Sequence, residues 1–259
     1  MAVAYSITAS GRYEPFGLQV SRGQIMGHRA VTIFGYNADV DTSEETIWTG
    51  GGILTHPAAA GVLKVSSASA DDAAAGTGAR TILLNGLDAN FNEISETVTL
   101  NGQTAVNTTK EYIRVQNLRV VTAGSGLTAA GTIYVGTGTV TSGVPATIYG
   151  EIAIGDNASL MAHYTIPAGY TGYFTYGNIG AGQLTGSHQI TARLLTSNSS
   201  NIRITAAIVA FGAGVQNFTF SEPIAIPEKT DVEASAVSSA GNSVVSATIQ
   251  LVLVKNDYT

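Results

Sequence analysis

The sequence predicts an all-β protein of two tandem β-sandwiches, the second jelly-roll-like, preceded by an extended N-terminal arm. Three observations predict this fold class. Short runs alternate apolar and hydroxylated residues, as in 93–100, where Ile94, Val98 and Leu100 share one side of an extended chain. Clusters of Gly, Ser and Asn separate such runs at the spacing of roughly 8–12 residues that is typical of sandwiches. No stretch shows the apolar period of a full-length helix.

The arm is predicted over residues 1–55. It contains Pro15, closes on Gly50-Gly51-Gly52, and has no sustained period apart from one short strand at 30–34. A segment without its own core is ordered only when something holds it, and we expect a neighbouring subunit to do so. A disordered tail is the alternative.

The first sandwich is predicted over residues 56–150. Asn85-Gly86 and Asn101-Gly102 predict hairpin turns, since a type I′ turn needs positive φ at both central residues. A bulge near Gln116-Asn117 would return Leu118 to the apolar side. Glu96 falls on an apolar face, so its strand is either an edge or pairs with Arg80. The expected strands are 62–66, 80–84, 93–100, 112–121, 132–135 and 147–154.

The second sandwich is predicted over residues 151–259. Its clearest strand is 244–254, where apolar residues alternate without a break and the opposite face is also largely apolar. We therefore expect a central strand covered on both sides. The other expected strands are 160–166, 172–176, 189–196, 202–211, 215–220 and 231–237.

The composition excludes several classes of function. Charged residues make up 12% of the chain, against about 25% in typical soluble domains, so much of the surface must be uncharged and suited to permanent protein contact. The net charge is −6 with no Lys/Arg cluster, which argues against nucleic acid and anionic membranes as partners. The chain has no cysteine, which excludes disulfides and thiol catalysis.

The sequence also lacks targeting signals for export or membrane insertion. Its N-terminus is not a basic segment followed by an apolar one, as in a secretory signal. No apolar run approaches the ~20 residues of a membrane helix. We expect a soluble protein synthesised in a cytoplasm.

The candidate catalytic and metal-binding residues form no local motif. The histidines, His28, His56, His163 and His188, are far apart, and the serines form no G-x-S-x-G elbow. We therefore expect no catalytic residue, metal ligand or cofactor, the alternative being a zinc or hydrolytic site assembled from distant strands.

Two acidic segments are candidates for cation binding, but each has a simpler structural interpretation. Residues 88–93 begin like a calcium loop, yet Glu93 occupies the position of the loop glycine, which favours an Asx-rich turn. The run 39–45 is interpreted as a solvated loop or a contact to a basic patch on a partner, with cation binding as the alternative.

Large apolar and aromatic side chains are the candidates for partner contact. Tyrosines crowd residues 164–176, where they bind a partner or belong to the core and rim. Trp48 either anchors in a neighbour's pocket or packs on its own first sandwich. The expected contact residues are Phe16, Ile25, Phe34, Trp48, Tyr170 and Tyr173.

Two stretches resemble a known family. They are SRGQIMGHRAVTIFGYNADVDTSEETIWTGGG (21–52) and GARTILLNGLDANFNEISETVTLNGQTAV (78–106), with a looser likeness through 152–173 and 227–234. They are similar to virion structural proteins of marine tailed bacteriophages, the cyanophage-like group in particular. The resemblance implies a location in the virion and transfers no residue roles.

Together these features predict a homo-oligomeric capsid decoration or cement protein that stabilises the phage head. We expect a homotrimer by analogy with other jelly-roll virion modules, bound to the major capsid protein or other virion proteins. A tail-fibre, adaptor or receptor-binding protein is the alternative from the same particle. A glycan-cleaving or glycan-binding module is the alternative from another class, and hydrolysis there would need two facing carboxylates.

Overall fold

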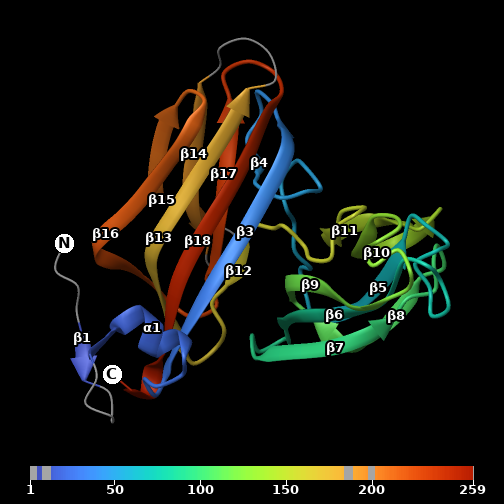
Figure 1. Ribbon diagram of the computed structural model, residues 1–259, viewed down its shortest axis with the longest axis horizontal. Helices are drawn as coiled ribbons and strands as arrows, with labels where there is room; N and C mark the ends of the chain where they lie inside the picture. Colours follow the sequence, from blue (N-terminus) through green and yellow to red (C-terminus); the bar gives the residue numbers. More distant parts are fainter. Residues whose placement is uncertain (1–4, 8–12, 184–188, 198–201, 259) are drawn as a thin grey trace.

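Strand residues account for 63% of the structure and helical residues for 3%, which confirms the all-β prediction. The computed structural model describes residues 5–7, 13–183, 189–197 and 202–258. Its strands form several antiparallel sheets, and four of these build two sandwiches of different size (Figure 1). Within these ranges the helices are short: α1 (Phe16–Ser21) and the 3-10 helix η1 (Asn256–Tyr258).

The large sandwich consists of two facing sheets. One has the order β16 (Gly214–Ile226), β13 (Tyr170–Gln183), β18 (Ser243–Lys255) and β3 (His28–Val40). The other has the order β12 (His163–Thr165), β17 (Asp231–Ser238), β14 (Ile190–Ser197) and β15 (Arg203–Phe211), with β4 (Glu45–Thr46) also paired to β17. Ile249 and Leu251 of β18 pack in the core between the two sheets.

The small sandwich is formed by the chain between β4 and β12 (Figure 1). Its four-stranded sheet has the order β11 (Val144–Ile152), β10 (Ile133–Thr141), β5 (Gly61–Ser67) and β8 (Val106–Tyr112). Its three-stranded sheet has the order β7 (Glu93–Thr99), β6 (Ala79–Leu87) and β9 (Arg114–Ala123). A second hydrophobic core, separate from that of the large sandwich, lies here and includes Leu63, Ile82 and Leu118.

The prediction of an extended arm over residues 1–55 is wrong for residues 28–54. Strand β3 pairs with β18 along its length, and Ile33 and Val40 are buried in the large core. The residue types of β3 do not show the alternation of apolar and polar residues that marks a strand. Gly35 and Asn37 take inward positions while Phe34 and Tyr36 face outward. Nearer the N-terminus, β1 (Tyr5–Ile7) pairs with β2 (Tyr13–Pro15). The second sandwich therefore includes residues from before the first, and the boundary at residue 150 stays a prediction.

Strand β18 is central in its sheet, as predicted, between β13 and β3. It is not covered on both sides. Val245, Leu251 and Leu253 are buried on one face, whereas Ser246 and Gln250 are exposed on the other. These two polar residues interrupt the apolar second face that the valines suggested.

The two Asn-Gly dipeptides do not form hairpin turns. Asn85 and Gly86 lie inside β6, where a Cβ on Gly86 would come within 2.2 Å of the carbonyl oxygen of Arg114, so the glycine permits close packing of strands. Gly102 has a φ of +60°, but it follows the end of β7, which pairs with β6, whereas β8 pairs with β5. The Asn101-Gly102 segment therefore carries the chain from one sheet to the other.

Three finer predictions for the small sandwich have clear outcomes. The bulge is confirmed: Val115 pairs with Gly86 and Asn117 with Asn85, which leaves Gln116 as the extra residue. Strand β7 is an edge, as one alternative for Glu96 required, and the Glu96 carboxylate accepts hydrogen bonds from Thr109 rather than from Arg80. Residues 106–112 form β8, a strand that the sequence analysis did not predict.

The integration of β3 can be tested at Gly35. A Cβ there would lie 2.3 Å from the carbonyl oxygen of Ile47 and 2.4 Å from the Cβ of Ala162. We expect Gly35→Val to lower the free energy of unfolding by about 3 kcal/mol, at the upper end of the range for overpacked cores. Urea denaturation measures this change. Gly61→Ala is the control, since nothing lies within 4 Å of a Cβ at that position. A Gly35→Val protein as stable as the wild type would contradict the close packing of β3.

Candidate functional site

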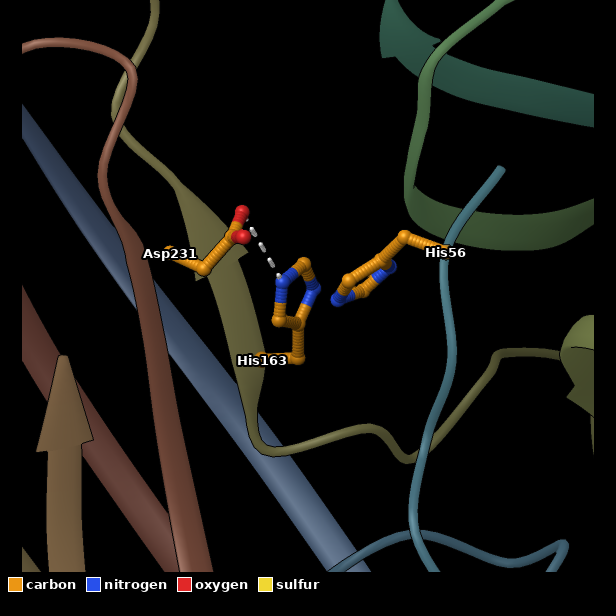
Figure 2. Close-up of side chains that lie close together, drawn as sticks. All are labelled: His56, His163 and Asp231. Carbon is orange, nitrogen blue, oxygen red and sulfur yellow. Dashed lines mark ion pairs between the residues drawn. The ribbon is translucent and has the colours of Figure 1, made fainter. Parts of the chain in front are cut away.

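The segment between β4 and β5 crosses from the large sandwich to the small one and carries a histidine to their junction. Its Trp48 and Leu54 are buried in the small core. His56 follows, and its ring lies against that of His163, the first residue of β12 (Figure 2). The ring centroids are 4.3 Å apart and the ring planes are inclined by 38°.

His163 is fully buried, and neither of its ring nitrogens has a hydrogen-bond partner. Its Nε2 lies 3.6 Å from Oδ1 of Asp231, which is longer than a hydrogen bond (Figure 2). The Nδ1 of His56 is also buried and unpartnered. One ligand-type atom from each of His56, His163 and Asp231 lies within 4.8 Å of the others.

Asp231 is the most heavily bonded member of this cluster. Arg114, the first residue of β9, donates from Nε and Nη2 to the two carboxylate oxygens, each over 2.9 Å. The hydroxyl of Thr165 donates to Oδ1 over 2.5 Å. Because Arg114 belongs to the small sandwich and Asp231 to the large one, this ion pair joins the two, and both side chains are buried.

The bulge in β9 adds a second polar link at the same junction. The Gln116 side chain donates from Nε2 to the carbonyl oxygen of Thr165 over 2.6 Å and accepts from the Thr165 amide over 2.9 Å. A side-chain amide thus completes the backbone hydrogen bonds of Thr165 in β12. The extra residue of the bulge is what turns Gln116 toward the large sandwich.

Burial and neighbouring charges set the protonation of the cluster. Burial raises the pKa of Asp231, but its interactions with His163 and Arg114 outweigh this and hold the pKa well below the usual range. Burial, followed by the proximity of His163, lowers the pKa of His56 well below its usual value. At neutral pH the cluster therefore contains an ionised carboxylate and a neutral His56 ring.

A pocket of about 440 Å³ adjoins the cluster. Its lining includes the polar residues His56, Arg114, Asp231, Arg203 and Glu233. Arg203 donates to Glu233 over 2.5 Å, and the Thr46 hydroxyl donates to the same oxygen over 2.7 Å. Apolar residues such as Leu54 and Ile113 also line the pocket, and both of its carboxylates are paired with arginines.

The structure does not bring the predicted contact residues together. Trp48 is buried in the small core and donates from Nε1 to the carbonyl oxygen of Gly51, so its predicted role as a partner anchor is wrong. Phe16 and Phe34 are exposed, while Ile25, Tyr170 and Tyr173 are half-buried. Partner contact by these five residues stays a prediction.

The Asx-rich turn is confirmed, because Oδ1 of Asp88 accepts hydrogen bonds from the amides of Asn90 and Asn92. The acidic run 39–45 is partly internal rather than a solvated loop. Glu45 is buried and accepts from Asn37 and the Gly52 amide, and Glu44 pairs with Arg193.

Sequence reasoning missed the cluster because Arg114 and Asp231 are 117 residues apart and the histidines have no motif spacing. One signal was present: His163 interrupts the otherwise apolar or uncharged run 160–166, which marks it as a buried histidine. His188 lies outside the described residues. Within the described ranges, no helix has the length and apolar character needed to cross a membrane.

Comparisons with known proteins do not identify a family. No protein-family model matches the chain, and no curated protein matches it. Among solved structures, the chain is similar at 10% identity to the VP2 subviral particle of infectious bursal disease virus, over 89% of this chain and 72% of that one, with a TM-score of 0.23. It is also similar to the structure of the Gx strain of that virus, at 10% identity over 88% of this chain and 72% of that one, with a TM-score of 0.25. These scores are too low to support an argument about fold or function.

The buried ion pair can be tested by removing one partner. Arg114→Ala leaves the Asp231 charge buried and unpaired, so we expect the free energy of unfolding to fall by about 3–5 kcal/mol. Urea denaturation followed by fluorescence of Trp48, the single tryptophan, measures this loss. In the control Arg22→Ala, which removes an exposed pair with Glu14, the loss should stay below about 1 kcal/mol. Similar losses in both variants would contradict the assignment.

The same pair predicts the direction of acid sensitivity. The folded-state pKa of Asp231 is lowered, below the value of about 3.9 for an unfolded Asp. Its contribution to stability is therefore fully present above about pH 4 and is lost as the pH falls further. In Arg114→Met/Asp231→Leu, which removes both charges, the fall in stability below pH 4 should be shallower. Identical profiles of stability against pH for the wild type and this variant would show that the Arg114–Asp231 pair is not the source of the acid sensitivity.

Proposed function

We propose that this chain is a structural protein of a phage virion, a homotrimeric decoration or cement protein that binds the capsid and stabilises the head. The observation that carries the proposal is a charge-poor open side of the large sandwich, formed by two neighbouring edge strands, on which Ile204, Ile208 and Val215 are exposed. The winding of that sandwich and the sequence resemblance to virion proteins of marine tailed phages support it.

The strand pairing of the large sandwich supports a jelly-roll winding. Apart from the three-residue β12, which pairs with β17, the strands along the chain are β3, β4, β13, β14, β15, β16, β17 and β18. In this series the first strand pairs with the last, the second with the seventh, the third with the sixth and the fourth with the fifth. Nested pairs of this kind arise when one long hairpin rolls into two sheets, as in the jelly rolls of viral capsids. The small sandwich is then an insertion between the second and third strands.

The open side is formed by β15 and β16, each the last strand of its sheet. Ile204 and Ile208 of β15 are 57% and 58% exposed, and Val215 of β16 is 62% exposed. Between residues 203 and 226 the only charged residues are Arg203 and Glu222. Edge strands of monomeric proteins are normally guarded by charges, so an apolar edge of this length favours coverage by another protein surface.

A second copy of the chain is the occupant we propose for this side. The edge strands of one copy can pair with those of a neighbouring copy, or their exposed apolar side chains can pack against it. In a closed ring of copies, every such edge strand is then covered. Residues 28–54 do not form an assembly arm, because β3 pairs within the large sandwich and Trp48 and Leu54 are buried in the small core of the same chain. Self-association therefore depends on the edge strands.

The mechanism of the proposed decoration protein is mechanical. Two cores, joined by a buried ion pair, give a rigid block. Many such blocks on a capsid add contact area across neighbouring capsid subunits, and this resists the pressure of packaged DNA.

The location is tested by antibody labelling of intact phage particles, imaged in negative stain. Label over the head supports the decoration protein, and particles stripped of the protein should lose resistance to heat or osmotic shock. Label at the tail would contradict the decoration protein and support a tail-fibre, adaptor or receptor-binding protein. Unlabelled particles would overturn the virion proposal altogether.

The oligomeric interface is tested with Ile204→Lys/Ile208→Lys. Two ammonium groups on β15 should convert the proposed trimer to monomers, since burying unpaired charges is costly. Light scattering coupled to size-exclusion chromatography measures the mass. The matched control is Val62→Lys/Val121→Lys, at two positions of similar exposure on the small sandwich, and it should leave the mass unchanged. A monomeric wild type, or equal masses for both variants, would show that β15 is not the interface.

A further inference from the structure

We propose that His56, His163 and Asp231 bind a divalent transition-metal ion of the zinc class, which fixes the connecting segment and the small sandwich against the large one. The three ligands come from three separate parts of the chain: the segment between β4 and β5, strand β12 and the first residue of β17 (Figure 2). This inference is independent of the proposed role in the virion.

The geometry fits such an ion after a small adjustment. With bonds of 2.0–2.1 Å, two ligands of a tetrahedral centre lie roughly 3.4 Å apart. Nε2 of His163 and Oδ1 of Asp231 are already 3.6 Å apart. All three ligand atoms lie within 4.8 Å of one another, so closing the site needs a movement of about 1 Å. His56 lies outside the strands, on the connecting segment, which allows its ring to turn.

The state of the imidazoles is the second argument. His163 is fully buried with both ring nitrogens unpartnered, and His56 has a buried unpartnered Nδ1. A buried polar atom without a partner costs free energy, so such atoms call for a ligand.

The choice of ion follows from the ligand types. Two imidazoles and one carboxylate suit zinc and its neighbours in the first transition row, whereas calcium and magnesium prefer oxygen ligands. The pocket of about 440 Å³ reaches His56 and Asp231, which provides an entry path and space for a water molecule as a fourth ligand.

Arg114 opposes the ion electrostatically, because its guanidinium contacts the same carboxylate. The carboxylate of Glu233, which lines the same pocket and lies opposite His163 in the strand register, partly balances this charge. Thr165 holds Oδ1 of Asp231 in place. We therefore expect an ion that stabilises the junction but is removed by strong chelators.

The test is calorimetric titration of the chelator-treated full-length protein with Zn²⁺ at neutral pH, with the visible absorption of added Co²⁺ as a probe of the ligands. The wild type should bind one ion per chain, and its melting temperature should rise. His56→Gln, on the connecting segment, should weaken binding by more than the roughly 10–100-fold loss caused by removing an outer-shell partner. His28→Gln, a histidine away from the cluster, is the matched control and should bind like the wild type.

His163→Gln removes a fully buried ligand and should also abolish binding. Because that variant can fail to fold, the decision rests on His56→Gln. A wild type that binds no Zn²⁺, or a His56→Gln protein with unchanged affinity and an unchanged Co²⁺ spectrum, would overturn the assignment and leave the two rings as a packed pair without an ion.

Discussion

The ion pair between Arg114 and Asp231 is the interaction on which the arrangement of the two sandwiches depends. Each charged group begins a strand of a different sandwich, and both are removed from water. A buried charge without its partner is strongly destabilising, so each sandwich constrains the position of the other. The Gln116 side chain reinforces this constraint through the backbone of Thr165. Two hydrophobic cores, each sufficient for its own sheets, are thereby held as one body.

This constraint explains why polar residues gather at the junction. His56, His163, Thr165 and Glu233 lie near the ion pair: His56 is on the segment that crosses between the sandwiches, and the other three are on the paired strands β12 and β17. An apolar junction would be easier to bury but would specify orientation less sharply, whereas paired charges and amides accept one geometry. The same polarity creates a site at which two imidazoles and a carboxylate can share an ion.

The outer surface of the large sandwich, unlike the junction, has few charged groups along β15 and β16. Its inward residues satisfy a dense core, while β15 and β16 leave apolar side chains and strand edges open. A well-packed core combined with open edge strands suits a subunit of a symmetric assembly. Such a block needs few charges, which agrees with a composition of 12% charged residues.

The sequence by itself determined the all-β class, most of the strands, the bulge at Gln116 and the central position of β18, because period-2 alternation is a local property of the chain. It predicted only residues 30–34 of β3 as a strand, since Gly35 and Asn37 face inward there and reverse the usual pattern. Nor did it reveal the cluster of His56, His163 and Asp231. Only the tertiary structure decided these features, because contacts between residues more than a hundred positions apart depend on how the sheets pack, and local patterns carry no record of that packing.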